Sequence, residues 1–254
     1  MIRAFASGLR VHLVQLLRSP FDIIGMLVWP IIFASIAYYL IGVDGSPGLL
    51  LSASLGAAVM MMWSQVIVGS GFALDNQRIQ GTLELLVAAP VPLAVLFAPI
   101  MIASAMFGLY GLLVTLVWGR FAFGIPFRID DPVAFAAATG SSIVAIGLLG
   151  MIAASTFVLY RAAFYLGVAL QYPVYIACGL IVPFSVLPGW LDPISWLLAP
   201  TWGLRGLREA ALGGDPWPDI GVCLLLSAAY FVIAVPCLWG FERLARGRAT
   251  LKLA

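Results

Sequence analysis

Six stretches of the chain contain no Asp, Glu, Lys or Arg, and each is at least 21 residues long. They are residues 23–43, 45–74, 85–119, 132–160, 162–191 and 220–241. An α-helix needs about 20 apolar residues to cross a bilayer, whereas the strands of a membrane barrel alternate in polarity over about 10 residues. The stretches therefore predict an all-α membrane protein with six transmembrane helices.

Composition and charge placement agree with this fold. The chain of 254 residues is 63% hydrophobic and 9% charged, against about 25% charged residues in a soluble domain. Six spans put both termini on one side. Placing them in the cytoplasm puts nine basic residues inside and four outside, which follows the positive-inside bias. The nine are Arg3, Arg10, Arg18, Arg78, Arg161, Arg243, Arg246, Arg248 and Lys252, and the four are Arg120, Arg128, Arg205 and Arg208.

We divide the chain into residues 1–20, an amphipathic interfacial helix, and residues 21–254, the transmembrane domain. Apolar residues recur at helical spacing over residues 2–18, with basic and small residues on another face. Such a helix is suited to lying in the inner membrane interface. The alternative is a frayed basic N-terminus that only anchors the topology.

The inner segment, residues 75–92, follows the second span and reads DNQRIQGTLELLVAAPVP. Thr82 is a suitable helix N-cap, Glu84 then lies in the first turn, where the helix dipole favours a carboxylate, and Pro90 ends the helix. The segment predicts a short amphipathic helix on the membrane surface, which would suit a cytoplasmic partner. A capped interfacial start to the third span explains the same residues equally well.

The outer segment, residues 183–213, lies between the fifth and sixth spans. It is apolar, but Pro183, Pro188, Pro193 and Pro200 divide it into pieces too short to cross a membrane. Irregular backbone survives at membrane depth only where protein or water satisfies its polar groups. We expect short helices that dip into the outer leaflet and return, or else an amphipathic loop that rests on the headgroups.

The amino-acid content of the chain excludes several kinds of chemistry. His12 is the only histidine and Lys252 the only lysine, so a histidine-based zinc site or Ser-His-Asp triad in the membrane and a P-loop with its lysine are both absent. The net charge of +2 implies no nucleic-acid partner. The spans hold only mild polar residues, whereas ion-coupled pumps usually place charges inside the bundle. An apolar pathway of this kind suits a lipophilic or amphiphilic substrate and an external source of energy.

Two motifs resemble the permease subunits of type-2 ABC exporters, most closely the compact bacterial drug-resistance type. The first is a charged stretch followed by G-T-L-E-x-L, an apolar run and a proline, seen here at Arg78, Gly81–Leu86 and Pro90. The second is a proline- and tryptophan-containing region with a basic end. Its matching residues are Pro183, Leu187, Pro188, Trp190, Leu191, Pro200 and Arg208.

This resemblance implies partners and roles. A second permease protomer, identical or a paralogue, would pair with the chain in the lipid bilayer, and two cytoplasmic ABC ATPase subunits, which bind the ATP and Mg, would dock below. The chain itself would hold no catalytic residue, cofactor or metal. The residues expected to couple it to the ATPase are Arg10, Arg18, Arg78, Gly81, Thr82, Leu83, Glu84, Leu85, Leu86 and Pro90. The residues expected at an outer gate are Pro183, Leu187, Pro188, Trp190, Leu191 and Pro200.

The leading functional hypothesis is therefore a multi-pass permease in the bacterial plasma membrane. It would export a lipophilic drug, lipid or lipid-linked substrate by alternating access, driven by a separate ATPase. One alternative is a polysaccharide or glycolipid permease of the same superfamily, because aromatic residues such as Trp63, Tyr110, Trp118, Tyr172 and Tyr175 could line a glycan pathway. Another is a non-transporting membrane scaffold or sensor for an ATPase.

Replacing Glu84 with Arg tests the inner segment as the ATPase contact. We expect Glu84→Arg to abolish transport and to leave membrane insertion intact, because it reverses a charge at the expected contact without adding polarity to a span. Transport in vesicles and the amount of inserted protein are the two measurements. Undiminished transport would refute the assignment.

Overall fold

The protein is helical throughout the part of the chain that the structure describes. The computed structural model describes residues 6–11, 14, 18, 20–41, 46–69, 71, 79–81, 93–125, 129–159, 161–181 and 188–252, and no strand occurs among them. The long helices are α2 (Pro20–Ile41), α3 (Pro47–Ser64), α6 (Leu93–Phe123), α7 (Pro132–Leu159), α8 (Arg161–Ala177) and α11 (Trp217–Lys252). The shorter elements are the π-helical turn η1 (Gln65–Gly69), the 3-10 turn η3 (Gly189–Leu191), α9 (Asp192–Leu197) and α10 (Ala199–Leu212).

Four helices in the described residues are long and apolar enough to cross a membrane. They contain Ile23–Leu40, Pro47–Val68, Pro132–Ala153 and Trp217–Gly240, which correspond to the first, second, fourth and sixth expected spans. The third expected span lies in α6, where Phe107–Phe123 is a shorter apolar stretch. The fifth coincides with α8, which ends at Ala177, several residues before the outer segment begins at residue 183. The all-helical membrane fold is confirmed, and the six-span topology stays a prediction.

Prolines and short polar caps begin two of the spans. Pro47 is the first residue of α3, and the Ser46 hydroxyl accepts from the Leu49 N–H at 3.4 Å. Pro132 is the first residue of α7, and Asp131 Oδ1 accepts from the Val133 and Ala134 N–H groups at 3.0 and 2.9 Å. Proline is suited to a first turn because its missing N–H would have no partner there. Both helices therefore start abruptly after short connections.

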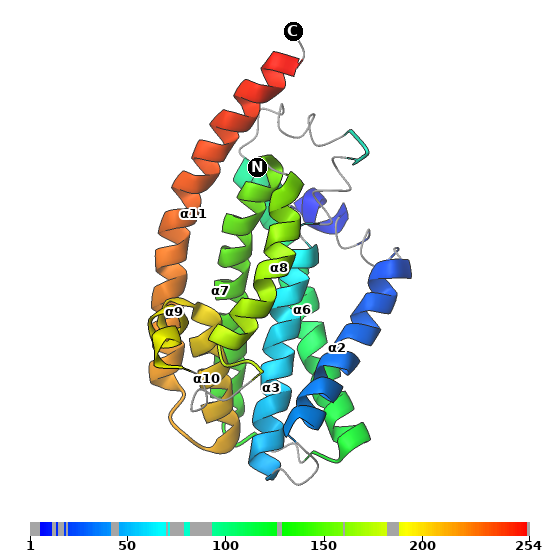
Figure 1. Ribbon diagram of the computed structural model, residues 1–254, viewed down its shortest axis with the longest axis vertical. Coiled ribbons are helices and arrows are strands. Elements are labelled where there is room, and N and C mark those ends of the chain that lie inside the picture. The colour runs from blue at the N-terminus through cyan, green and yellow to red at the C-terminus, as the bar shows by residue number, and fades with distance from the viewer. Residues whose placement is uncertain are drawn as a thin grey trace.

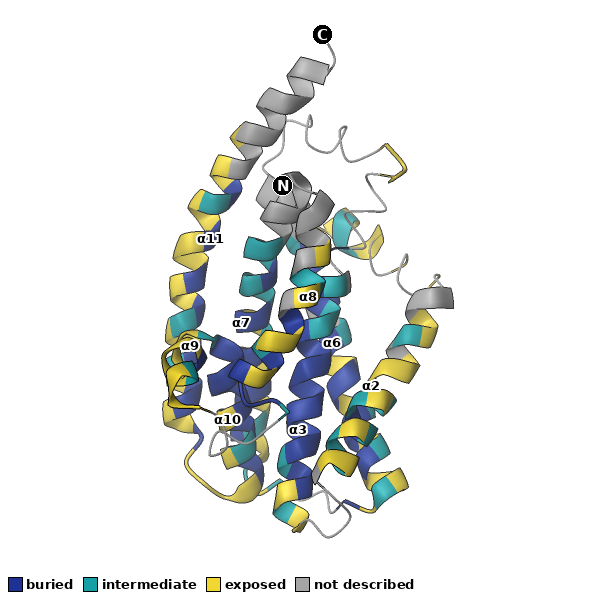
Figure 2. Cartoon of the chain, in the orientation of Figure 1, coloured by how far each residue is buried: buried dark blue, intermediate teal, exposed yellow. Residues whose placement is uncertain are grey.

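Helix α3 lies at the centre of the bundle. Figure 1 shows it surrounded by α2, α6, α7, α8 and α10, and Figure 2 shows that it is buried along most of its length. Small residues let the neighbouring backbones approach, as in other membrane bundles. Gly108 of α6 packs on Met62, and an added methyl group there would lie 3.1 Å from the Met62 Cα atom. The residues that follow α3 form η1, where Val66 fills the space left by Gly150 of α7.

Helix α11 is longer than a bilayer requires. Its 36 residues correspond to about 54 Å at 1.5 Å per residue, whereas the hydrocarbon core is about 30 Å thick. It projects past the other helices at the end of the bundle where α2 begins (Figure 1). Trp239 is exposed, and the Arg243 guanidinium lies over its ring, 5.5 Å from the ring centroid. Such a pair is typical of a membrane interface.

Substituting Gly56 tests the close contact at the centre. A methyl group on Gly56 of α3 would overlap the Leu180 carbonyl oxygen, a backbone atom, so we expect Gly56→Ala to destabilise the fold by about 1–3 kcal/mol. Gly140→Ala is the matched control, because no atom of a neighbouring helix lies within 4 Å of the added methyl group. Thermal unfolding in nanodiscs measures both variants. Equal melting temperatures for the two would contradict the packing.

Candidate functional site

The chain changes direction where α8 stops. Helix α8 ends part of the way along the bundle, and α10 continues from about that level to the end where α3 and α7 begin (Figure 1). Gly179 takes a positive φ of 64°, which glycine adopts without strain. The Leu180 N–H donates to the Tyr175 carbonyl at 3.0 Å. A tight turn thus closes α8 and leaves its last carbonyl groups facing the outer segment.

Helix α9 is attached both to the end of α8 and to α10. The Ser195 hydroxyl donates to the Ala177 carbonyl, the last residue of α8. The Trp202 indole N–H donates to the Trp196 carbonyl at 3.0 Å, and the two rings meet edge to face with centroids 5.1 Å apart. These contacts give hydrogen-bond partners to the Ala177 and Trp196 carbonyls and pack the pieces separated by prolines as one unit.

The start of α10 is fixed to α11 by Tyr230. The Tyr230 hydroxyl donates to the Leu197 carbonyl and accepts from the Ala199 N–H at 3.1 Å. The Cys223 thiol lies 3.7 Å from the Ala199 carbonyl. The first N–H groups of a helix have no partner within it, and Pro200, at the second position of α10, has no N–H to satisfy. One tyrosine and one proline therefore complete this helix start.

One face of α10 lies closely against α7. Gly203 approaches the Ser142 side chain so closely that a Cβ atom would overlap its hydroxyl oxygen. One turn later, a Cβ atom on Gly206 would lie 3.5 Å from that of Ala138. The Ser142 hydroxyl itself donates to the Ala138 carbonyl at 2.7 Å. Glycine on α10 and small residues on α7 thus permit a contact that larger side chains would prevent.

Arg208 joins α10 to both α3 and the end of α8. Its Nη2 donates to the Gly179 carbonyl at 3.2 Å, and its Nε to the Ser52 carbonyl at 3.4 Å. Among the described residues no carboxylate lies within ion-pair distance of it. Burial lowers the pKa of Arg208 to about 10, so the side chain stays charged at neutral pH. The negative end of the α8 dipole stabilises that charge.

The far end of α10 meets the start of α7 and of α11. Gly213 has a φ of 86° and ends α10, and its N–H and that of Gly214 both donate to the Glu209 carbonyl, at 3.0 and 2.9 Å. The Asp131 N–H, at the start of α7, donates to the Ala210 carbonyl at 3.0 Å. Arg205 lies 3.7 Å from Asp219 of α11. Helices α3, α8 and α11 and the start of α7 therefore each have a polar contact with α9 or α10.

The expected outer-gate residues are placed only in part. Pro188 precedes η3, Trp190 is exposed, Leu191 is half-buried and Pro200 is buried in α10. Pro183 and Leu187 lie outside the described residues. Trp190 and Trp196 are exposed, as tryptophans at a membrane interface often are, and whether this region dips into a membrane stays a prediction.

The expected ATPase-coupling residues are mostly not described. Arg78, Thr82, Leu83, Glu84, Leu85, Leu86 and Pro90 lie outside the described residues. Gly81 is exposed with a φ of 69°, and Arg10 and Arg18 are exposed. No contact among the described residues joins either arginine to Gly81. The N-terminal helical residues do pack on α6, where Leu9 and Phe107 contact Ala103.

Three polar contacts of this region were not predicted from the sequence: those made by Ser195, Tyr230 and the side chain of Arg208. The sequence did give one signal for Arg208, which is a basic residue on the predominantly apolar outer segment. Ser195 and Tyr230 gave none, because a serine and a tyrosine in apolar runs are common in membrane helices.

Removing the Arg208 guanidinium tests the junction of α3, α8 and α10. We expect Arg208→Gln to lower the free energy of unfolding by about 1–3 kcal/mol, since two buried carbonyl oxygens lose a charged donor. Arg205→Gln is the control: its side chain is 45% exposed, and exposed ion pairs contribute little. Thermal unfolding measures the loss of stability in both variants. A loss in Arg205→Gln as large as that in Arg208→Gln would contradict the assignment.

The chain was compared with protein families and with curated proteins. Residues 15–212 match the family model of the ABC-2 type transporter, and this match covers α2 through α10 with all the contacts of Arg208. No curated protein sequence matches the chain significantly. Because the family model covers well over half of the chain, the protein belongs to the ABC-2 type transporter family and is a membrane permease component.

Proposed function

We propose that this chain is the membrane-spanning subunit of an ATP-driven exporter in the bacterial inner membrane. It moves a lipophilic drug, lipid or lipid-linked molecule outward, and a separate ATPase chain binds the ATP and Mg. Permease domains of this family generally work with ABC ATPase partners. The sequence of this chain contains no P-loop motif, which supports an ATPase on another chain.

One observation carries the proposal: α3 contacts the outer segment, residues 183–213, and is followed in the chain by the inner segment, residues 75–92. Its first half contacts the outer segment through the Ser52 carbonyl and Gly56. The turn η1, which follows α3, leads along the chain to the inner segment at residues 75–92. A helix is a stiff element, so a displacement at one end of α3 reaches the other.

The mechanism follows from this connection. Two ATPase subunits close on ATP and push the inner segments of two paired protomers. Helix α3 shifts against α10, and the bonds from Arg208 to Ser52 and Gly179 lengthen or exchange. Helices α9 and α10 move together, because Ser195 and Trp202 hold them to each other and to α8. The pathway then opens on the outer side, and ATP hydrolysis resets it.

Transport in inside-out vesicles tests the function. The chain is co-expressed with a candidate ABC ATPase from the same organism, and accumulation of the neutral dye Nile red is followed after ATP addition. We expect ATP-dependent accumulation that disappears when the P-loop lysine of the ATPase is replaced with Ala. Vesicles with the ATPase alone are the control. Equal dye uptake with and without the chain, across a panel that includes a lipid and a glycolipid probe, would refute the proposal.

A further inference from the structure

Helix α11 has one face that packs on α7 and α10 and another that no described helix covers. The buried residues recur every three or four positions and are Cys223, Ser227, Tyr230, Ala234 and Leu238. On the opposite face Leu225, Val232 and Trp239 are 70%, 69% and 63% exposed. These three residues, which we call the exposed stripe, fall seven positions apart in the apolar stretch Trp217–Gly240. They therefore share one side of the helix, and that side faces lipid chains.

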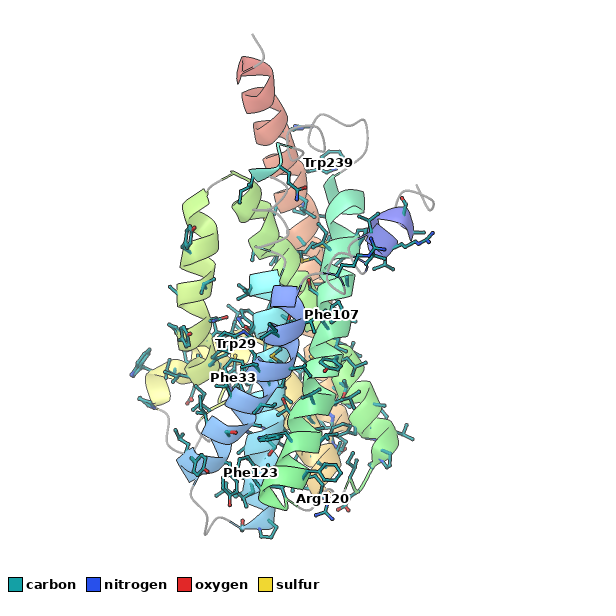
Figure 3. All side chains as sticks on the ribbon, turned by 90° about the vertical axis from the view of Figure 1, so that its right-hand side faces the viewer. Trp29, Phe33, Phe107, Arg120, Phe123 and Trp239 are labelled. Atoms are coloured by element: carbon teal, nitrogen blue, oxygen red, sulfur yellow. The ribbon has the colours of Figure 1, made fainter. Side chains whose placement is uncertain are left out.

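Arg243 continues the exposed stripe by one helical turn. It follows Trp239 by four residues, which places the two side chains on the same face, and its guanidinium lies 5.5 Å from the centroid of the Trp239 ring. Figure 3 shows Trp239 at the opposite end of the bundle from Arg120 and Phe123. The pair thus stands where the apolar part of α11 ends and its charged end begins.

The Arg243 guanidinium has no anionic partner within the described part of the chain. The side chain is exposed, and it makes no hydrogen bond or ion pair with a described residue. The positions three and four residues away, where a helical ion-pair partner would stand, are Trp239, Gly240, Arg246 and Gly247. None of them is acidic, and a methyl group added at Gly240 would meet open space. The guanidinium donors are therefore left for a molecule beside the helix.

Charge decides which molecule suits this end of the helix. Residues 241–252 hold four basic residues and one acidic residue, which are Arg243, Arg246, Arg248, Lys252 and Glu242. A guanidinium binds phosphate oxygens through parallel N–H bonds, and a tryptophan at the membrane interface lies at the level of the lipid headgroups. A second copy of the chain suits the stripe less well, because symmetric packing through it would bring two Arg243 side chains together. A lipid phosphate meets no such repulsion.

We propose that Trp239 and Arg243 form a binding site for the phosphate of an anionic phospholipid on the lipid-facing side of α11. The phosphate oxygens accept from the Arg243 guanidinium, the Trp239 ring holds that guanidinium at headgroup level, and the acyl chains lie along the exposed stripe. The site goes beyond the proposed function, because lipid binding here requires neither transport nor an ATPase. With the C-terminus in the cytoplasm, as the charge distribution predicts, the lipid belongs to the inner leaflet.

Two lipids with the same acyl chains test the site. The full chain, purified in a mild detergent, is titrated with palmitoyl-oleoyl phosphatidylglycerol or palmitoyl-oleoyl phosphatidylcholine, and native mass spectrometry counts the bound lipid. Both lipids carry a phosphate, and only phosphatidylglycerol has a net negative charge. We expect phosphatidylglycerol to bind tighter by about three- to tenfold, the effect of one basic residue beside an anionic lipid. An excess of inorganic phosphate is expected to leave it bound, because free phosphate lacks the acyl chains.

Four variants assign the contacts. Arg243→Gln removes the charge, so we expect it to abolish the preference for phosphatidylglycerol, whereas Arg243→Lys keeps the charge and the preference. Trp239→Leu keeps an apolar side chain and is expected to weaken phosphatidylglycerol binding by about two- to fivefold, the effect of one cation–π pair. Arg248→Gln is the matched control. It removes the same charge from the same helix end, but its position lies about 140° around the helix from Arg243 at about 100° per residue, so we expect the preference to remain.

Each outcome either supports the lipid site or overturns it. Equal losses in Arg243→Gln and Arg248→Gln would show that diffuse charge attracts the lipid, and would overturn the site. A preference that survives Arg243→Gln would overturn it too, including the case in which this variant loses a co-purifying ATPase and the face belongs to a protein partner. Displacement of phosphatidylglycerol by inorganic phosphate would refute the lipid assignment. A preference that depends on Arg243 and Trp239 but not on Arg248 would support the site, whatever the vesicle assay finds.

Discussion

The guanidinium of Arg208, bonded to two backbone carbonyls, joins three helices that no other single side chain connects within the described residues. A charge is costly in an apolar bundle, and it is stable here because the end of α8 offers carbonyl groups and the negative end of a helix dipole. The arrangement requires α8 to stop early, Gly56 to lack a side chain and α10 to lie at a suitable depth. The contacts of Arg208 therefore depend on the broken outer segment and on the central helix α3 together.

The packing of α10 depends on that same early stop. Since α8 ends at Ala177, a space remains between α7, α11 and α3, and α9 and α10 fill it. Glycines at 203 and 206 bring α10 close to α7, and Tyr230 completes the hydrogen bonds of its first turn. The contacts are short-range and specific, so α9 and α10 can move as a unit while their own backbone bonds stay intact.

Much of the fold could be predicted from where charges are missing. Charged residues are unfavourable inside the bilayer, so they mark the ends of the spans. The charge-free stretches therefore matched α2, α7 and the apolar part of α11 within a few residues. The end of α8 was not predicted, since residues 178–184 are as apolar as the helix before them. The helix ends just before Gly179, which takes a positive φ. The hydrogen bonds of Ser195, Tyr230 and Arg208 depend on tertiary positions, which no local pattern in the sequence records. The inner-segment residues, Glu84 among them, stay predictions.

The π-helical turn η1 (Gln65–Gly69) interrupts the regular helical winding directly after α3. A π turn closes its hydrogen bond over one residue more than an α turn, and each residue of an α-helix turns the chain by about 100° and advances it by about 1.5 Å. Val66, seated in the space beside Gly150, holds that extra residue in place. The position of η1 relative to α7 therefore depends on the fit of one valine against one glycine, and a side chain added at Gly150 would displace Val66.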